Sequence, residues 1–269
     1  MDIRKKYNIN LAGHHGQPML FAHGYGCDQH MWRYVVPAFE EDFKVILFDH
    51  IGSGGSDHSF YQKSKYATLE GYSNDILEIC HGLHLKDTIF VGHSVSAMIG
   101  ILAAIKDPSP FSHLILVAPS PCYINDGDYI GGFSREDIDG LLVALESNYL
   151  GWSAQMAPAI IGNLDRPELG EELTNSFCRT DPDIAKNFAK ATFLSDNRQE
   201  LPQLKVPSLI LQCSEDLIAP KTVGKYMKKH IPQSEMVIMD ATGHCPNLSA
   251  PEETVACIKS YLSANNAYA

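Results

Sequence analysis

The sequence predicts an α/β protein with a mostly parallel sheet that is flanked by helices. Short apolar runs of strand length alternate with longer stretches of helical periodicity, and this alternation is typical of a parallel sheet covered on both faces. A block of helical pieces interrupts the alternation in the second half of the chain. A serine also stands in a turn between a predicted strand and a predicted helix. These three observations indicate one α/β core with a helical insertion and a site at the strand ends.

The predicted strands are apolar runs that stop at turn residues. They cover residues 18–22, 43–48, 88–91, 114–118, 206–211 and 236–239. A helix is expected over residues 68–84, where apolar side chains recur at helical spacing and Thr68 is a suitable N-cap. A second helix begins after Ser94, and the last one runs from about residue 251 to 262. The alternation of strand and helix supports the parallel arrangement.

No run of strand type is present between residues 123 and 195. Helix starts are indicated there at Ser134, at Asp165-Arg166-Pro167 and at Asp181-Pro182, because these residues favour helix N-termini. We therefore expect residues 1–122 and 196–269 to form the core, and residues 123–195 to form a helical insertion.

Composition excludes some classes of partner. The chain has 269 residues, 45% of them hydrophobic and 20% charged, and a net charge of −11. Nucleic acids and anionic membrane surfaces attract basic proteins, so neither is an expected partner. No secretory signal and no apolar run of about 20 residues is apparent, which favours a soluble cytoplasmic protein. The seven cysteines contain no Cys-X-X-Cys pair and are expected to be buried free thiols in a reducing compartment.

Ser94 is the candidate nucleophile. The segment Val91-Gly92-His93-Ser94-Val95-Ser96 has the strand–turn–helix context in which a Gly-X-Ser-X-Gly nucleophile elbow is meaningful. Serine replaces the second glycine of that motif at position 96. A serine side chain is small, so the motif is relaxed but retained.

A serine nucleophile needs a base, and the base needs a group that orients it. His244 and Asp216 each follow a predicted strand directly, at the edge where open α/β sheets build their sites. Their order after Ser94 is the order of the nucleophile-elbow fold. Glu215 is an alternative orienting group. Asp49 is interpreted as a structural carboxylate, and His23 and His93 are given no catalytic role.

An oxyanion hole requires two converging N–H groups. The backbone amide of Val95 follows the nucleophile, and the amide of Tyr25 lies in the glycine-rich turn His23-Gly24-Tyr25-Gly26 after the first strand. This fold places its second donor in that loop. The alternative for this segment is an ordinary glycine turn.

With these residues identified, the chain resembles the α/β-hydrolases. More narrowly, it resembles the RsbQ-type bacterial stress-signalling hydrolases and the plant karrikin and strigolactone receptors. The matching stretches are residues 23–29, 48–54, 92–100, 129–133, 188–191, 195–196, 211–213 and 223–226. Serine at position 96 also occurs among the plant relatives. Tyr25 and Met156 stand where phenylalanine is usual, which affects the shape and polarity of the pocket.

The resemblance implies an α/β-hydrolase fold with a four-helix lid over a small, mostly apolar pocket. It also implies hydrolysis of small esters or lactones and, in the RsbQ-type proteins, work alongside a partner protein phosphatase. By position, the pocket lining is expected to comprise Tyr25, Phe133, Trp152, Met156, Phe193 and Leu217. Ordinary helix packing is the alternative for the lid residues among them.

The expected mechanism has Ser94 attacking a carbonyl, His244 moving the proton and Asp216 orienting His244, with no metal or organic cofactor. A ligand-sensing protein with slow or single turnover is the main alternative. It would recruit its partner through the lid, whose acidic residues are equally explained as a solvated face; they are Glu136, Asp137, Asp139, Glu171 and Glu172. A C–C bond hydrolase can use the same triad, whereas a dehalogenase would need a carboxylate in place of Ser94.

Overall fold

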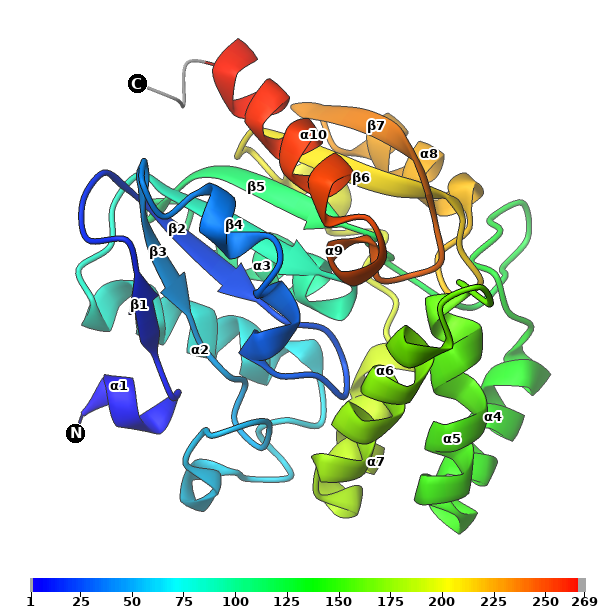
Figure 1. Ribbon diagram of the computed structural model, residues 1–269. Helices are drawn as coiled ribbons and strands as arrows, with labels where there is room; N and C mark the ends of the chain where they lie inside the picture. The colour runs from blue at the N-terminus through cyan, green and yellow to red at the C-terminus, as the bar shows by residue number, and fades with distance from the viewer. Residues whose placement is uncertain (1, 266–269) are drawn as a thin grey trace.

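The computed structural model describes residues 2–265. Its centre is a seven-stranded sheet with the order β1-β3-β2-β4-β5-β6-β7 (Figure 1). Among the strand pairings of this sheet within residues 2–265, β1 with β3 is antiparallel and the others are parallel. The strands are β1 Asn10–Ala12, β2 Gln17–Ala22, β3 Phe43–Leu47, β4 Thr88–His93, β5 Phe111–Val117, β6 Ser208–Glu215 and β7 Ser234–Thr242. The predicted mostly parallel sheet is therefore confirmed.

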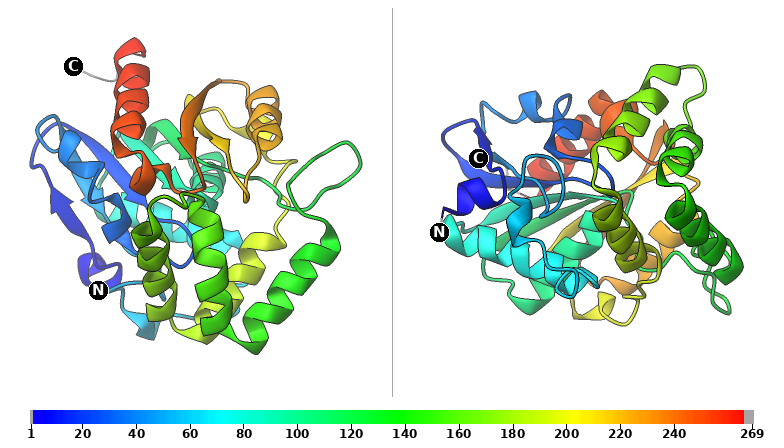
Figure 2. Two further views of the ribbon diagram at one scale, coloured as in Figure 1. Left: turned by 45° about the vertical axis from the view of Figure 1, so that its right-hand side comes forward. Right: turned by 90° about the horizontal axis from the view of Figure 1, so that it is seen from below.

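Helices cover both faces of the sheet (Figures 1 and 2). They are α1 Ile3–Lys6, α2 Leu69–Gly82, α3 Val95–Lys106, α4 Arg135–Ser147, α5 Tyr149–Ile161, α6 Pro167–Arg179, α7 Pro182–Phe193, α8 Lys221–His230, α9 Pro246–Ser249 and α10 Pro251–Ala264. Short 3₁₀ turns, η1 Gln29–Trp32, η2 Val36–Ala38, η3 His58–Phe60 and η4 Leu201–Gln203, join some of them. No helix within residues 2–265 is both long and apolar enough to cross a membrane.

The two faces of the sheet are buried in two separate apolar clusters. On β2, Met19 and Phe21 belong to the cluster that includes residues of α10. Leu20 and Ala22 belong to the cluster that includes residues of α2 and α3. Successive strand side chains point to opposite faces, so strands buried on both sides are apolar throughout. This explains why the strands were recognisable as continuous apolar runs.

The four helices α4 to α7 follow one another between β5 and β6. They lie together beyond the carboxyl ends of the strands (Figure 1, green to yellow). Local chemistry fixes where they begin. Ser134 and Asp137 form a reciprocal capping box at α4, Pro167 occupies the first turn of α6, and the Asp181 carboxylate accepts two backbone N–H groups at α7. An antiparallel bridge between Cys122 and Asp196 joins the two ends of this segment.

Some local details differ from the sequence-based expectation. Thr68 occupies the N-cap position of α2, but its side chain makes no capping hydrogen bond. Strand β1 was missed because three residues are too few to show periodicity. The N-terminus of α5 was also missed, although the Asn148 side chain accepts a hydrogen bond from the N–H of Gly151 there at 3.0 Å.

The cysteines within the described residues are free thiols. Five are buried, Cys257 is half-buried and Cys178 is exposed, so the expectation of burial holds for most but not for all of them. Cys178 lies near the end of α6, on the solvent side of that helix.

Candidate active site

Ser94 occupies a sharp turn between β4 and α3. Its backbone has φ 57° and ψ −124°, in the left-handed half of the map that a residue with a side chain rarely adopts. A Cβ added to Gly92 would lie 2.7 Å from the backbone of Ser96. Glycine at position 92 therefore lets the first turn of α3 approach the end of β4. The strained serine and this close packing are the features of a nucleophile elbow.

Ser94, His244 and Asp216 form one chain of hydrogen bonds. The distance from Ser94 Oγ to His244 Nε2 is 2.7 Å, and the distance from His244 Nδ1 to Asp216 Oδ2 is also 2.7 Å. The second carboxylate oxygen of Asp216 accepts the backbone N–H groups of Ile218 and Ala219 at 2.8 and 3.1 Å. With one oxygen held by the backbone, the other is fixed toward the imidazole. Glu215 is exposed and takes no part in this chain.

The arrangement is protected from water. The side chain of His244 is 5% exposed and that of Asp216 is not exposed at all. The neutral imidazole can accept the Ser94 proton at Nε2 while it donates its Nδ1 proton to Asp216, which fixes the tautomer. A geometry of this kind can supply an alcohol nucleophile next to a general base.

Two backbone amides beside Ser94 have no partner. Among residues 2–265, neither the N–H of Tyr25 nor that of Val95 donates a hydrogen bond. The Tyr25 loop is packed against the elbow, because a Cβ at Gly24 would lie 2.6 Å from His93 Nδ1. Free amides next to a nucleophile can stabilise a developing oxyanion.

Buried histidines brace the loops around the nucleophile. His93 donates from Nε2 to the carbonyl of His244 at 2.8 Å. Ser96 donates to the carbonyl of His23 and lies 2.7 Å from His50 Nε2, so it links the loops that follow β2 and β3. Asp49 accepts hydrogen bonds from Asn8 and from the backbone of Gln29 and Gly55, which is the structural role expected for it. The contacts of Ser96 explain how serine is accommodated at the second glycine position of the elbow motif.

The buried histidines make stability depend on pH. Burial and the neighbouring His244 lower the pKa of His93 to about 3, and burial lowers the pKa of His50. Both rings stay neutral when folded but take up a proton near pH 6.5 when unfolded. The unfolded state then binds more protons, so stability is highest above pH 6.5 and falls as the pH drops toward 3. For His93 alone we expect a loss of about 2 kcal/mol between pH 7 and 5.

Urea unfolding at pH 7, 6 and 5 measures this loss. The His93→Gln variant is the control, because it removes one titrating ring and should show a shallower dependence on pH. Equal slopes for the two proteins would contradict the assignment of the effect to His93.

A small cavity of about 30 Å³ adjoins Ser94 and His244. Of the six predicted lining residues, Tyr25 and Phe193 contribute to its wall. Trp152 lies behind the wall and stacks on Phe177 at a ring-centroid distance of 5.7 Å. Phe133 and Met156 are partly buried in the same apolar cluster but do not line this cavity. Its volume admits water but is far below that of ordinary ligand pockets.

Leu217 was expected to line the pocket, but its neighbour Ile218 does so instead. Leu217 is 52% exposed, whereas Ile218 is 4% exposed and lines the cavity. The Asp216 carboxylate holds the backbone of residues 218 and 219 in a tight turn. That turn directs Leu217 outward and Ile218 inward.

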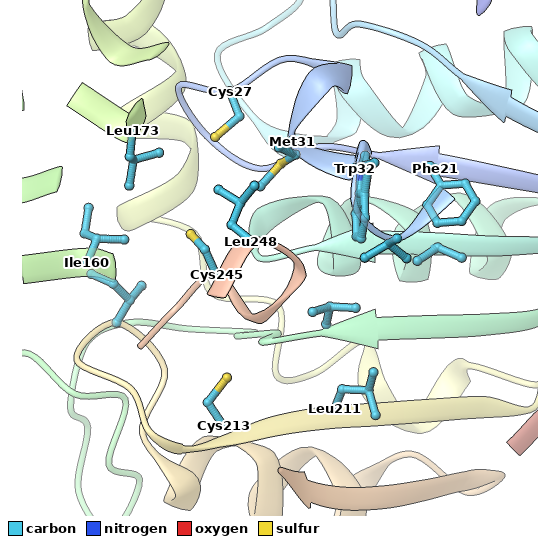
Figure 3. Packing of buried hydrophobic residues seen from close by; sticks show 14 of the residues in the cluster. Phe21, Cys27, Met31, Trp32, Ile160, Leu173, Leu211, Cys213, Cys245 and Leu248 are labelled. Atoms are coloured by element: carbon cyan, nitrogen blue, oxygen red, sulfur yellow. The ribbon is translucent and has the colours of Figure 1, made fainter. Parts of the chain in front are cut away.

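Several lining residues were not predicted. They are Cys27, Tyr123, Ile160, Leu173, Phe177, Thr192, Ile218 and Cys245. Figure 3 shows Ile160 and Leu173, from α5 and α6, on the side where Cys27 and Cys245 lie. Helical periodicity identifies the inner faces of α5 and α6, but only the packed helices show which turn reaches the site.

Tyr123 places a phenol group in the wall of the cavity that Ser94 lines. It is 2% exposed and lines the same cavity as Ser94. Burial raises the pKa of Tyr123, while the Ser94 hydroxyl acts in the opposite direction. The phenol stays protonated near neutral pH and is available as a hydrogen-bond donor.

An ion pair ties residues 123–195 to the core. Arg33 binds Glu172 of α6 through both guanidinium Nη atoms, at 2.7 and 2.6 Å. Asp137 is used in the capping box of α4, and Asp139 pairs with Arg135 at 3.0 Å. Three of the five acidic residues noted in the sequence therefore have partners within the described structure.

The fold and these contacts define the class of protein: an α/β-hydrolase sheet with a nucleophile elbow at the end of β4. Residues 19–256 match the alpha/beta hydrolase family, and the chain belongs to that family. The chain is similar to a karrikin-insensitive-2 receptor of Petunia hybrida, with 37% identity over 97% of both chains. It is also similar to a strigolactone esterase of Pisum sativum, with 38% identity over 93% of this chain and 94% of the relative.

A solved structure supports the same relationship. A hydrolase from Oleispira antarctica superposes with a TM-score of 0.95 at 40% identity, covering 97% of this chain and 96% of that one. The resemblance to the plant receptors and the predicted fold are thereby confirmed. Because the match includes esterases and a hydrolase, hydrolase chemistry is supported for this chain.

Proposed function

We propose that this protein is a serine hydrolase of the carboxylesterase or lactonase type, acting on a small apolar ester or lactone. The hydrogen-bonded chain Ser94–His244–Asp216 carries the proposal. The free amides of Tyr25 and Val95 and the apolar cavity beside Ser94 support it.

In the proposed reaction, Ser94 Oγ attacks the carbonyl carbon and its proton passes to His244 Nε2. The amides of Tyr25 and Val95 hold the oxyanion. The carbon–oxygen bond to the leaving alcohol breaks, and His244 returns the proton to that alcohol. Water, deprotonated by His244, then attacks the acyl-enzyme, and Ser94 leaves with the proton from His244. Asp216 orients His244 and stabilises the imidazolium each time it forms.

We propose that residues 123–195 act as a lid over this site. Helices α5, α6 and α7 contribute Ile160, Leu173, Phe177, Thr192 and Phe193 to the cavity wall. Since about 30 Å³ admits no substrate, binding requires the lid side chains or helices to move outward. The ion pair between Arg33 of the core and Glu172 of α6 would have to break or stretch if α6 moved outward, so it resists that motion.

The alternative is a ligand-sensing protein that hydrolyses slowly or once and signals through a protein partner such as a phosphatase. The closed cavity favours slow access, and one relative is named as a receptor. Product formed per mole of protein from p-nitrophenyl acetate separates the two functions. Many turnovers support the hydrolase, whereas one equivalent of product with a lasting acyl group supports the sensor.

A further inference from the structure

Two residues that line the cavity beside Ser94 carry buried hydroxyl groups without a hydrogen-bond partner among residues 2–265. Tyr25 and Thr192 both contribute to its wall. Within the described residues, the Tyr25 hydroxyl and Thr192 Oγ1 are sealed from solvent and make no hydrogen bond. Most of the remaining wall is aliphatic or aromatic. Buried polar atoms nearly always have partners, and each unpaired one costs about 1–3 kcal/mol.

The ring of Tyr25 is packed among other aromatic rings. The ring meets Trp152, Phe177 and Phe193 edge to face, at centroid distances of 6.3, 5.6 and 6.2 Å. Burial raises the pKa of Tyr25, and the nearby phenol of Tyr149 adds to this rise. The Tyr149 phenol donates its own proton to the carbonyl of Phe177 at 2.8 Å. Tyr25 is therefore held in an aromatic cage beside the Tyr149 phenol, and its hydroxyl makes no hydrogen bond within the described residues.

The small volume of the cavity, about 30 Å³, means that a bound substrate must come close to these hydroxyl groups. Any substrate larger than a few atoms must displace side chains from the wall, and Tyr25 and Thr192 belong to that wall. A substrate oxygen that reaches them would gain hydrogen bonds and relieve the cost of the unpaired groups. An apolar group of the same shape would leave that cost in place.

We propose that the hydroxyl groups of Tyr25 and Thr192 form a polar end of the substrate pocket and select esters or lactones whose acyl part carries a second oxygen acceptor. The acceptor is a keto, ether or ring oxygen placed away from the reacting carbonyl. The Tyr25 backbone amide faces the oxyanion while its phenol lies at the other end of its side chain, so one residue contacts both ends of the acyl group. This inference rests on the proposed hydrolase function.

The test compares two esters of matched shape, p-nitrophenyl levulinate and p-nitrophenyl isocaproate, which differ by a keto oxygen in place of a methyl branch. For the unmodified protein we expect kcat/KM to favour the levulinate ester by about tenfold or more. Tyr25→Phe keeps the backbone amide and removes the phenol, so the ratio should fall toward one. Thr192→Val should lower the ratio as well, and it provides a second reading if Tyr25→Phe does not fold.

Tyr72→Phe is the matched control. Its hydroxyl is also buried and makes no hydrogen bond in the described part of the chain, but its ring stacks on Phe188 and it is not among the residues that line the cavity. The control should retain the preference of the unmodified protein. An unmodified protein that hydrolyses both esters equally, or variants at positions 25 and 192 that keep the full preference, would overturn the inference alone. A protein that hydrolyses neither ester and gains no acyl group on Ser94 would overturn the proposed function with it.

Discussion

Replacing Ser94 with alanine is expected to lower kcat for ester hydrolysis by about 10⁴- to 10⁶-fold. The serine oxygen is the only atom that forms a covalent bond to the substrate in the proposed mechanism, and it lies 2.7 Å from His244 Nε2. Alanine removes that oxygen and leaves the two free amides in place. Binding should therefore persist while turnover is lost, so KM or ligand affinity should change far less than kcat. Initial rates with p-nitrophenyl acetate measure the effect.

Alanine should also be well tolerated at position 94. A left-handed backbone is strained for serine and alanine alike, and the thermal unfolding midpoint of the variant should stay close to that of the unmodified protein. Ser112→Ala, at a serine that bonds the carbonyl of Asp87 far from the site, is the control. A folded Ser94→Ala protein that retained most of its activity would show that another group is the nucleophile.

Replacing Asp216 with asparagine is expected to lower kcat by about 10⁴-fold. One Asp216 oxygen accepts two backbone N–H groups, and the other accepts the Nδ1 proton of His244 at 2.7 Å. An asparagine that keeps the backbone contacts with its carbonyl oxygen turns its NH₂ group toward His244. The imidazole must then carry its proton on Nε2, where it can no longer accept the proton of Ser94.

Glu215→Gln is the matched control, since it makes the same chemical change one residue earlier on an exposed side chain. It should keep nearly full activity, and both proteins are compared by kcat at saturating ester. If Glu215→Gln abolished activity while Asp216→Asn did not, the orienting carboxylate would be Glu215. The contrast between neighbouring residues separates orientation of the imidazole from a general loss of negative charge.

The core of the candidate site could be predicted because its residues are marked by local pattern. Ser94, Asp216 and His244 each stand directly after an apolar strand, and parallel strands bring their carboxyl ends to one edge. The order of the three residues along the chain, serine then aspartate then histidine, indicated which one is the nucleophile, which the orienting carboxylate and which the base. The backbone amide of Tyr25 could also be predicted from local pattern, because Tyr25 follows the first predicted strand and is flanked by glycines.

The pocket could be predicted only in part, because its wall is set by packing between distant segments. Trp152 was expected to line the pocket, but it does not line the cavity and instead stacks on Phe177, which does. The turn held by the Asp216 carboxylate points Ile218, and not Leu217, toward the cavity. Sequence periodicity does not reveal such a local change of direction. The unpaired hydroxyl of Thr192 is likewise visible only once α7 is packed against the core. These are tertiary effects, which residue spacing along one segment does not determine.

The central claim is that Ser94 becomes acylated during hydrolysis, and acid quenching of the unmodified protein during turnover of p-nitrophenyl acetate tests it most directly. Peptide mass analysis is expected to find one acetyl group on the peptide that contains Ser94. The group should disappear as the ester is exhausted, and it should be absent from that peptide in Ser94→Ala. Sustained hydrolysis with no acetyl group on Ser94, or with the group carried by a cysteine such as Cys27 or Cys245 of the cavity wall, would contradict the account.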